Sequence, residues 1–119
     1  MTETAYNENI GDCKQAVFFA TGSCNSITQQ FTDVLEYCKA KQMSIINIFI
    51  EQSNDDEKLY AILNNMLDFL AREKEKTAIV AASPKNLPKF ISYYDIMHLI
   101  VDDNIELHFA KTRSRFYKK

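Results

Sequence analysis

Short apolar segments alternate along this chain with longer segments in which apolar residues recur every three to four positions. The short segments are rich in β-branched and aromatic residues and are typical of buried strands, whereas the longer ones are typical of amphipathic helices. Strands joined by helices run parallel, because each helical crossover returns the chain to the same end of the sheet. The sequence therefore predicts an α/β fold: a three-layer, four-stranded, mostly parallel sheet with helices on both faces.

Seven segments make up this expected fold. Strands are predicted at residues 16–20, 44–50, 77–82 and 105–109, and helices at residues 27–38, 54–75 and 90–101. Ser26 is a suitable N-cap for the first helix, because its hydroxyl can accept a hydrogen bond from the first helical turn. The last strand alternates apolar and polar residues, which predicts one buried and one exposed face.

The chain has 119 residues, which is enough for one domain. Residues 1–14 are predicted to be a flexible N-terminal lead-in, residues 15–110 the α/β domain, and residues 111–119 a basic C-terminal tail. The basic residues of that tail are Lys111, Arg113, Arg115, Lys118 and Lys119. The tail has no acidic residue although the chain carries a net charge of −2. It is therefore the predicted site of contact with nucleic acid or, alternatively, a solubilising end.

The composition argues against several kinds of site and location. Two glycines are too few for a P-loop or a dinucleotide-binding motif. The three cysteines form no C-x-x-C pair, and neither His98 nor His108 lies at a ligand spacing from them, so we expect no metal and no small-molecule cofactor. No apolar stretch approaches the ~20 residues of a membrane span. The first residues are polar and acidic, unlike a secretory signal, so we expect a cytoplasmic protein without a membrane partner.

The carboxyl ends of parallel strands are where such sheets place ligands and active groups. Ser23 comes just after the first predicted strand, in the place of a hydroxyl nucleophile. Attack of a hydroxyl on a phosphate also requires groups that bind the phosphate, and arginine suits this role because its planar fork binds two oxygens. None of the three arginines lies at a predicted strand end before residue 110. Lys85 and Lys89, after the third strand, remain as candidate partners of Ser23.

A resemblance to a known family begins in the first predicted helix. Residues 26–43 read Ser-Ile-Thr-Gln-Gln-Phe-Thr-Asp-Val-Leu-Glu-Tyr-Cys-Lys-Ala-Lys-Gln-Met. This run resembles the first helix of the serine recombinases of the resolvase and invertase family, whose pattern is close to S-I-x-x-Q…L-x-x-Y-C-x-x-x-G. The likeness extends over about residues 15–110 and implies the N-terminal catalytic domain of that family.

The active-site motifs of the family are degenerate in this chain. Its first strand ends in R-V-S-T, with the serine as nucleophile, whereas the matching residues here are Ala20-Thr21-Gly22-Ser23. The family's D-R-L-x-R signature matches Lys85-Asn86-Leu87-Pro88-Lys89. The family's arginine before the second helix matches at best Lys58, whereas the family's glutamine in the first helix is retained as Gln30. The resemblance therefore implies that the residues required for strand exchange are missing.

Three functional hypotheses follow. The first is a catalytically inactive recombinase-like domain that acts by self-association, as a homodimer, or by binding a protein partner, in connection with DNA recombination or a mobile element. The second is a divergent strand-transfer enzyme that uses Ser23 with Lys85 and Lys89. The third is an unrelated flavodoxin-like binding module, whose interface would include the aromatic residues Phe90, Tyr93 and Tyr94.

Overall fold

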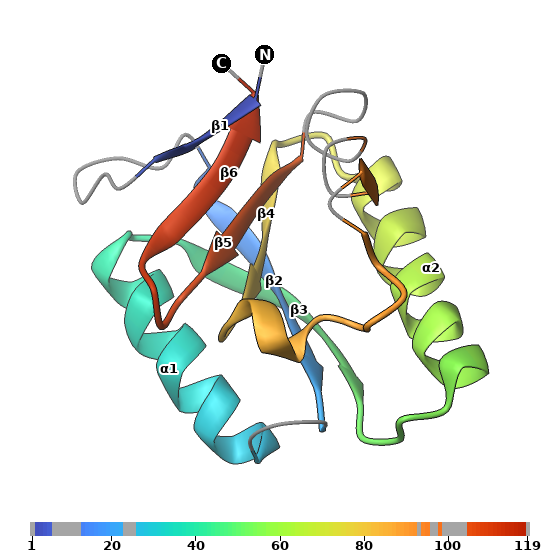
Figure 1. Cartoon of the computed structure of the whole chain (residues 1–119). Helices are drawn as coiled ribbons and strands as arrows, with labels where there is room; N and C mark the ends of the chain where they lie inside the picture. Colours follow the sequence, from blue (N-terminus) through green and yellow to red (C-terminus); the bar gives the residue numbers. More distant parts are fainter. Residues whose placement is uncertain are drawn as a thin grey trace.

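A computed structural model describes residues 2–5, 13–22, 26–92, 94–95, 98 and 105–118. The strands are β1 (Thr2–Ala5), β2 (Gln15–Thr21), β3 (Ser44–Glu51), β4 (Thr77–Ala81), β5 (Glu106–Phe109) and β6 (Ser114–Lys118). The helices are α1 (Ile27–Ala40), α2 (Asp56–Arg72) and the short 3₁₀ helix η1 (Pro84–Asn86). All the strands belong to one six-stranded sheet in the order β1-β6-β5-β4-β2-β3 (Figure 1).

The central part of the sheet confirms the predicted α/β class with a mostly parallel sheet. β2 pairs in parallel with β3 on one side and with β4 on the other, and β4 pairs in parallel with β5. The polypeptide passes through α1 between β2 and β3, and through α2 between β3 and β4. β2 and β4 are thus the two inner strands of the parallel part, and β3 is the edge strand of the sheet beside β2.

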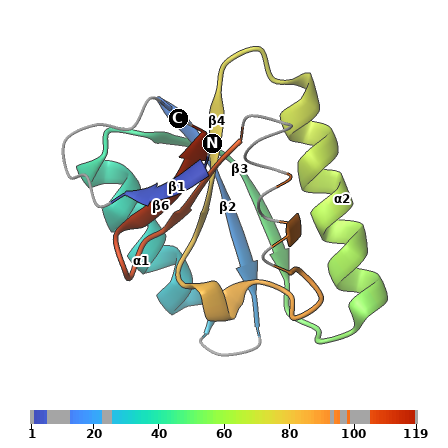
Figure 2. The same cartoon turned by 45° about the horizontal axis from the view of Figure 1, so that its top comes forward.

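The strand count and the outer boundaries of the domain differ from the prediction. β6 pairs antiparallel with β5, and β1 pairs antiparallel with β6 (Figures 1 and 2). Thr2 thus lies opposite Lys118. Part of the predicted lead-in (1–14) and most of the predicted tail (111–119) therefore belong to the sheet. A tight turn makes this possible: Arg113 adopts a φ of 53°, which reverses the chain and places Ser114 opposite Phe109.

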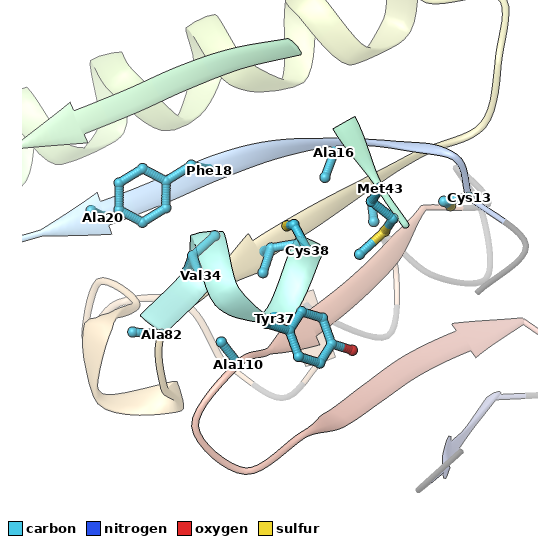
Figure 3. Packing of buried hydrophobic residues seen from close by; sticks show 12 residues of the cluster. Cys13, Ala16, Phe18, Ala20, Val34, Tyr37, Cys38, Met43, Ala82 and Ala110 are labelled. Atoms are coloured by element: carbon cyan, nitrogen blue, oxygen red, sulfur yellow. The ribbon is translucent and has the colours of Figure 1, made fainter. Parts of the chain in front are cut away.

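The core consists of two clusters that share β2. Ala16, Phe18 and Ala20 pack with residues of α1 such as Val34 and Tyr37 (Figure 3). Val17 and Phe19 point the other way and pack with residues of α2, including Met66 and Leu70. Alternate side chains of one strand point to opposite faces of a sheet, so the almost continuous apolar sequence of β2 follows from its burial on both faces.

The helix boundaries follow from their caps. Ser26 Oγ accepts a hydrogen bond of 3.1 Å from the backbone N–H of Gln29, and Asp55 Oδ1 accepts one of 2.9 Å from that of Glu57. Both caps satisfy N–H groups that have no partner within the helix. The third predicted helix, residues 90–101, falls mostly outside the described residues. Among the described helices, none is long and apolar enough to cross a membrane.

Candidate functional site

A pocket of about 300 Å³ opens at the carboxyl ends of the parallel strands. Its polar wall consists of Thr21 at the end of β2, Asn54 and Asp56 at the start of α2, and Lys85 and Lys89 after β4. Leu59, Leu87 and Pro88 form its apolar wall. The structure thus brings the two predicted lysines to the end of β2. Ser23, their predicted partner, lies outside the described residues.

Hydrogen bonds between buried groups fix the loop after β4 against β2. Thr21 Oγ1 donates to the backbone oxygen of Asn86 at 2.9 Å, and Gln30 Nε2 donates to the backbone oxygen of Thr21 at 2.6 Å. Ser83 Oγ donates to Asn86 Oδ1 at 3.0 Å. Asn86, which matches the first arginine of the recombinase signature, is fully buried and does not line the pocket. Gln30 and Asn86 therefore have a structural role in positioning this loop.

Gly22 leaves no space for a side chain at the position that matches the recombinase nucleophile. A Cβ atom at Gly22 would lie 2.8 Å from the backbone oxygen of Gln52 and 3.2 Å from its Cα. The backbone N–H of Gly22 also donates to the oxygen of Glu51 at 3.1 Å, which holds the two strand ends together. Because the neighbouring atoms are backbone, a serine at this position requires the chain to move.

The cations of the pocket are lysines. The side chains of Lys85 and Lys89 are exposed, and Asp56 places a carboxylate among them. Lysine attracts an anion as a point charge, without the two parallel hydrogen bonds that arginine makes to a phosphate. In the part of the chain that the structure describes, no arginine lines this pocket.

The arginines after β5 lie instead beside a buried polar cluster that the sequence analysis did not predict. Tyr37 Oη lies 2.6 Å from His108 Nδ1, and His108 Nε2 lies 2.8 Å from Glu106 Oε1. Glu106 also contacts Lys76 Nζ at 3.2 Å and Arg115 Nη1 at 3.7 Å. We call these five residues the Glu106 cluster. The alternation of residues 105–109 predicted an exposed polar face, but α1 and β6 bury it, and this prediction is wrong.

Electrostatics determines the proton positions in the Glu106 cluster. Burial raises the pKa of Tyr37 to about 12, so the phenol keeps its proton. Burial also tends to raise the pKa of Glu106, but the hydrogen bond and charge of His108, together with Lys76, hold it below its ordinary value. The imidazole of His108 lies between the two groups, because its Nδ1 is within hydrogen-bond distance of Tyr37 and its Nε2 within hydrogen-bond distance of Glu106. Apart from the half-buried Lys76, the cluster is buried, and it joins α1, β5 and β6.

The predicted nucleic-acid-binding residues do not all lie on the surface. Lys111 and Arg113 are exposed in the turn between β5 and β6. Arg115 is only 7% exposed, faces Glu106 and stacks 4.3 Å from the ring centroid of Tyr117. The backbone of Lys118 belongs to β6, and Lys119 lies outside the described residues. The prediction that all five basic residues of the tail are available to contact nucleic acid is therefore wrong for Arg115.

The predicted aromatic interface is only partly described. Phe90 is half-buried and stacks on Tyr60, with ring centroids 4.0 Å apart and planes inclined by 9°. Tyr94 is exposed, and its ring contacts His98 edge-on at 4.7 Å. Tyr93 lies outside the described residues.

A second hollow, which the sequence analysis missed, lies between α1 and β3. It measures about 580 Å³ and is lined by Phe31, Leu35, Cys38, Lys39, Met43, Ile45 and Ile48. Leu35 is 48% exposed, Ile48 46% and Ile46 38%. We call the hollow and the exposed side of β3 the α1–β3 surface. The sequence contains a signal for this surface. The segment Ser-Ile-Ile-Asn-Ile-Phe-Ile is apolar on both of its faces, which is more than a strand at the edge of a sheet, next to water, needs.

Comparison of the chain with protein-family models, with curated proteins and with solved structures finds no match. The functional argument therefore depends on the geometry described above.

Proposed function

We propose that this chain is a catalytically inactive, serine-recombinase-like domain that acts by self-association, with the three-layer arrangement that the order of its strands and helices predicts. The observation that carries the proposal is the α1–β3 surface. Its exposed side chains include Leu35 and Ile48, which border a hollow lined mainly by apolar residues. Contiguous apolar surface is costly in water, and burial against another protein removes that cost.

The geometry near the end of β2 supports the lack of catalysis. The position matching the nucleophile is Gly22, which packs against the backbone of Gln52, and the position matching the first signature arginine is the buried Asn86. A transition state at phosphorus gains several kcal/mol from each well-placed arginine, so the replacement of the set removes most of the stabilisation on which strand exchange depends.

The proposal is tested by measuring the mass of the purified protein over a wide range of concentration, with sedimentation velocity or light scattering. We expect a concentration-dependent dimer. A second sample at high salt separates apolar from electrostatic association, because salt screens the latter. A protein that remains monomeric at every concentration would contradict self-association as the function.

The strand-transfer hypothesis is the second candidate, and the pocket supports it. Lys85 and Lys89 converge on the end of β2, close in sequence to Ser23. In an active enzyme the Ser23 hydroxyl would attack a DNA phosphodiester, break the bond from phosphorus to one sugar oxygen and release that strand end as a free hydroxyl. The product is a covalent phosphoserine link with DNA, and Ser23→Ala would abolish it. The assay is denaturing electrophoresis of labelled nicked DNA after incubation with each protein, with Ser26→Ala as the matched control. Equal behaviour of wild type and Ser23→Ala eliminates this candidate.

A further inference from the structure

The edge strand β3 has one side without a partner strand. It pairs with β2 through residues 44–51, and in the part of the chain that the structure describes no strand pairs with its other side. Natural edge strands are usually short or carry lysine, proline or a bulge, which prevents pairing with another chain. β3 has eight residues, with neither lysine nor proline, and its single charged residue is Glu51.

The irregular part of β3 is confined to its beginning. The register with β2 shifts between Ala16 and Val17, which lie opposite Ile45 and Asn47, so that Ile46 is the extra residue. From Asn47 to Glu51 the pairing is regular. A regular segment of this kind is a template for a further strand, whereas the bulged segment before it is not.

Backbone groups in the regular segment alternate between the two sides of the strand. The oxygen of Glu51 accepts a hydrogen bond from Gly22 and therefore faces β2. By alternation, the backbone groups of Ile48 and Ile50 face away from β2. The N–H of Ile48 is bonded at 2.8 Å to the side-chain oxygen of Asn47. This bond is exposed, so an incoming strand can replace it.

We infer that residues 47–51 of β3 pair antiparallel with the same residues of a second copy and join the two sheets into one. The inference rests on the proposed self-association and specifies its geometry. With Phe49 opposite Phe49 on the two-fold axis, Ile48 of each copy lies opposite Ile50 of the other. The outward-facing groups of these residues then form hydrogen-bonded pairs across the axis.

The side chains fit this register. Ile48 and Ile50 lie on the α1 side of the strand. Ile48 lines the hollow, and Ile50 packs against the core cluster that α1 forms with β2. Their pairing continues the apolar surface from one copy to the next and brings exposed Leu35 of both copies to the same face. On the other side, Asn47 lies opposite Glu51, so that an amide can donate to a carboxylate.

The charges at the two ends of β3 are also complementary. Lys14 and Lys41 lie at its amino end, where the backbone oxygen of Lys14 accepts from Ser44. Asp55, Asp56 and Glu57 follow its carboxyl end and are exposed. Antiparallel pairing brings the acidic end of one copy to the basic end of the other, whereas parallel pairing would place like charges together. Two copies of this chain therefore complement each other at this edge.

The first test compares Ile48→Lys with the matched control Tyr60→Lys in the sedimentation experiment. Tyr60 has a similar exposed fraction, 50%, but lies on α2, outside the α1–β3 surface. Ile48→Lys should raise the dimer dissociation constant on the order of a hundredfold, because each dimer loses two buried isoleucines and desolvates two ammonium groups. Tyr60→Lys should leave it unchanged. If Tyr60→Lys breaks the dimer and Ile48→Lys does not, self-association stands and the β3 edge is excluded.

The second test measures amide hydrogen exchange by NMR at low and high protein concentration. The amides of Ile48 and Ile50 should exchange more slowly as the dimer forms, whereas those of Phe49 and Glu51, which face β2 within one copy, should be protected at every concentration. A dimer in which the exchange of Ile48 and Ile50 does not change overturns the strand pairing while leaving self-association intact. A protein that is monomeric throughout overturns both proposals.

Discussion

Single residues decide what the candidate site can do, and Gly22 is the clearest example. Gly22→Ser introduces a serine at the position that the recombinase resemblance assigns to the nucleophile, but its Cβ would lie 2.8 Å from the backbone oxygen of Gln52. We expect a loss of about 1–3 kcal/mol in the free energy of unfolding, measured in urea, and no gain of DNA cleavage. Gln52→Ala is the control, because it keeps the backbone and removes an exposed side chain. A fully stable Gly22→Ser protein would contradict the steric argument.

Tyr37 gives a second prediction at this scale. Tyr37→Phe removes the hydroxyl that lies 2.6 Å from His108 Nδ1 and leaves a buried nitrogen without that partner. The cost should be about 1–3 kcal/mol in the free energy of unfolding. Tyr60→Phe removes a hydroxyl from an exposed tyrosine and should change stability little. Equal unfolding curves for the two variants would show that the buried hydrogen bond does not stabilise the fold.

The pKa of Glu106 predicts how stability depends on pH. Folding lowers this pKa from its ordinary value of 4.5. The carboxylate therefore stabilises the folded protein above pH 4.5, and its contribution is lost as the pH falls through the lowered pKa. Glu106→Gln should be less stable at neutral pH and should lose less stability on acidification, as urea unfolding at a series of pH values would reveal. Glu75→Gln, on the surface, should keep the wild-type slope.

Elements differ in how far the sequence predicts them. The strands β2 to β5 and the helices α1 and α2 were predicted close to their observed bounds, because burial on one or two faces leaves a clear apolar period. β6 was not predicted, because its residues Ser-Arg-Phe-Tyr-Lys resemble a basic tail. Only the fold reveals that Arg115 has a buried acidic partner in Glu106.

The position of β6 predicts the effect of truncation. A chain that ends after Ala110 lacks β6, leaves the polar side of β5 open to water and removes Arg115 from Glu106. We expect a large loss of thermal stability and a less cooperative unfolding transition. Circular dichroism during heating measures both. A chain that ends after Tyr117 retains most of β6 and should unfold much like the wild type. Comparable melting of the two truncated chains would indicate that β6 contributes little.

At the scale of the whole molecule, the parallel topology explains which parts of the candidate site were predictable. Carboxyl ends of neighbouring parallel strands lie together, so the meeting of Lys85 and Lys89 with the end of β2 follows from strand order. The Glu106 cluster does not follow from it, since Tyr37 and His108 are 71 residues apart and come together only through packing of α1 on the sheet. The location of the α1–β3 surface could not be predicted either, because it depends on which strand lies at the edge of the sheet.

The pairing of β1 with β6 has a consequence for the dynamics of the sheet. It joins Thr2 to Lys118 and so closes a loop that contains almost the whole chain. The backbone entropy that β1 loses on pairing is offset by a strand of only four residues. β1 is therefore the strand that detaches first and forms last, and its amides should exchange fastest among those of the sheet. Each detachment uncovers the outer side of β6, which for that moment replaces β1 as the edge strand opposite β3.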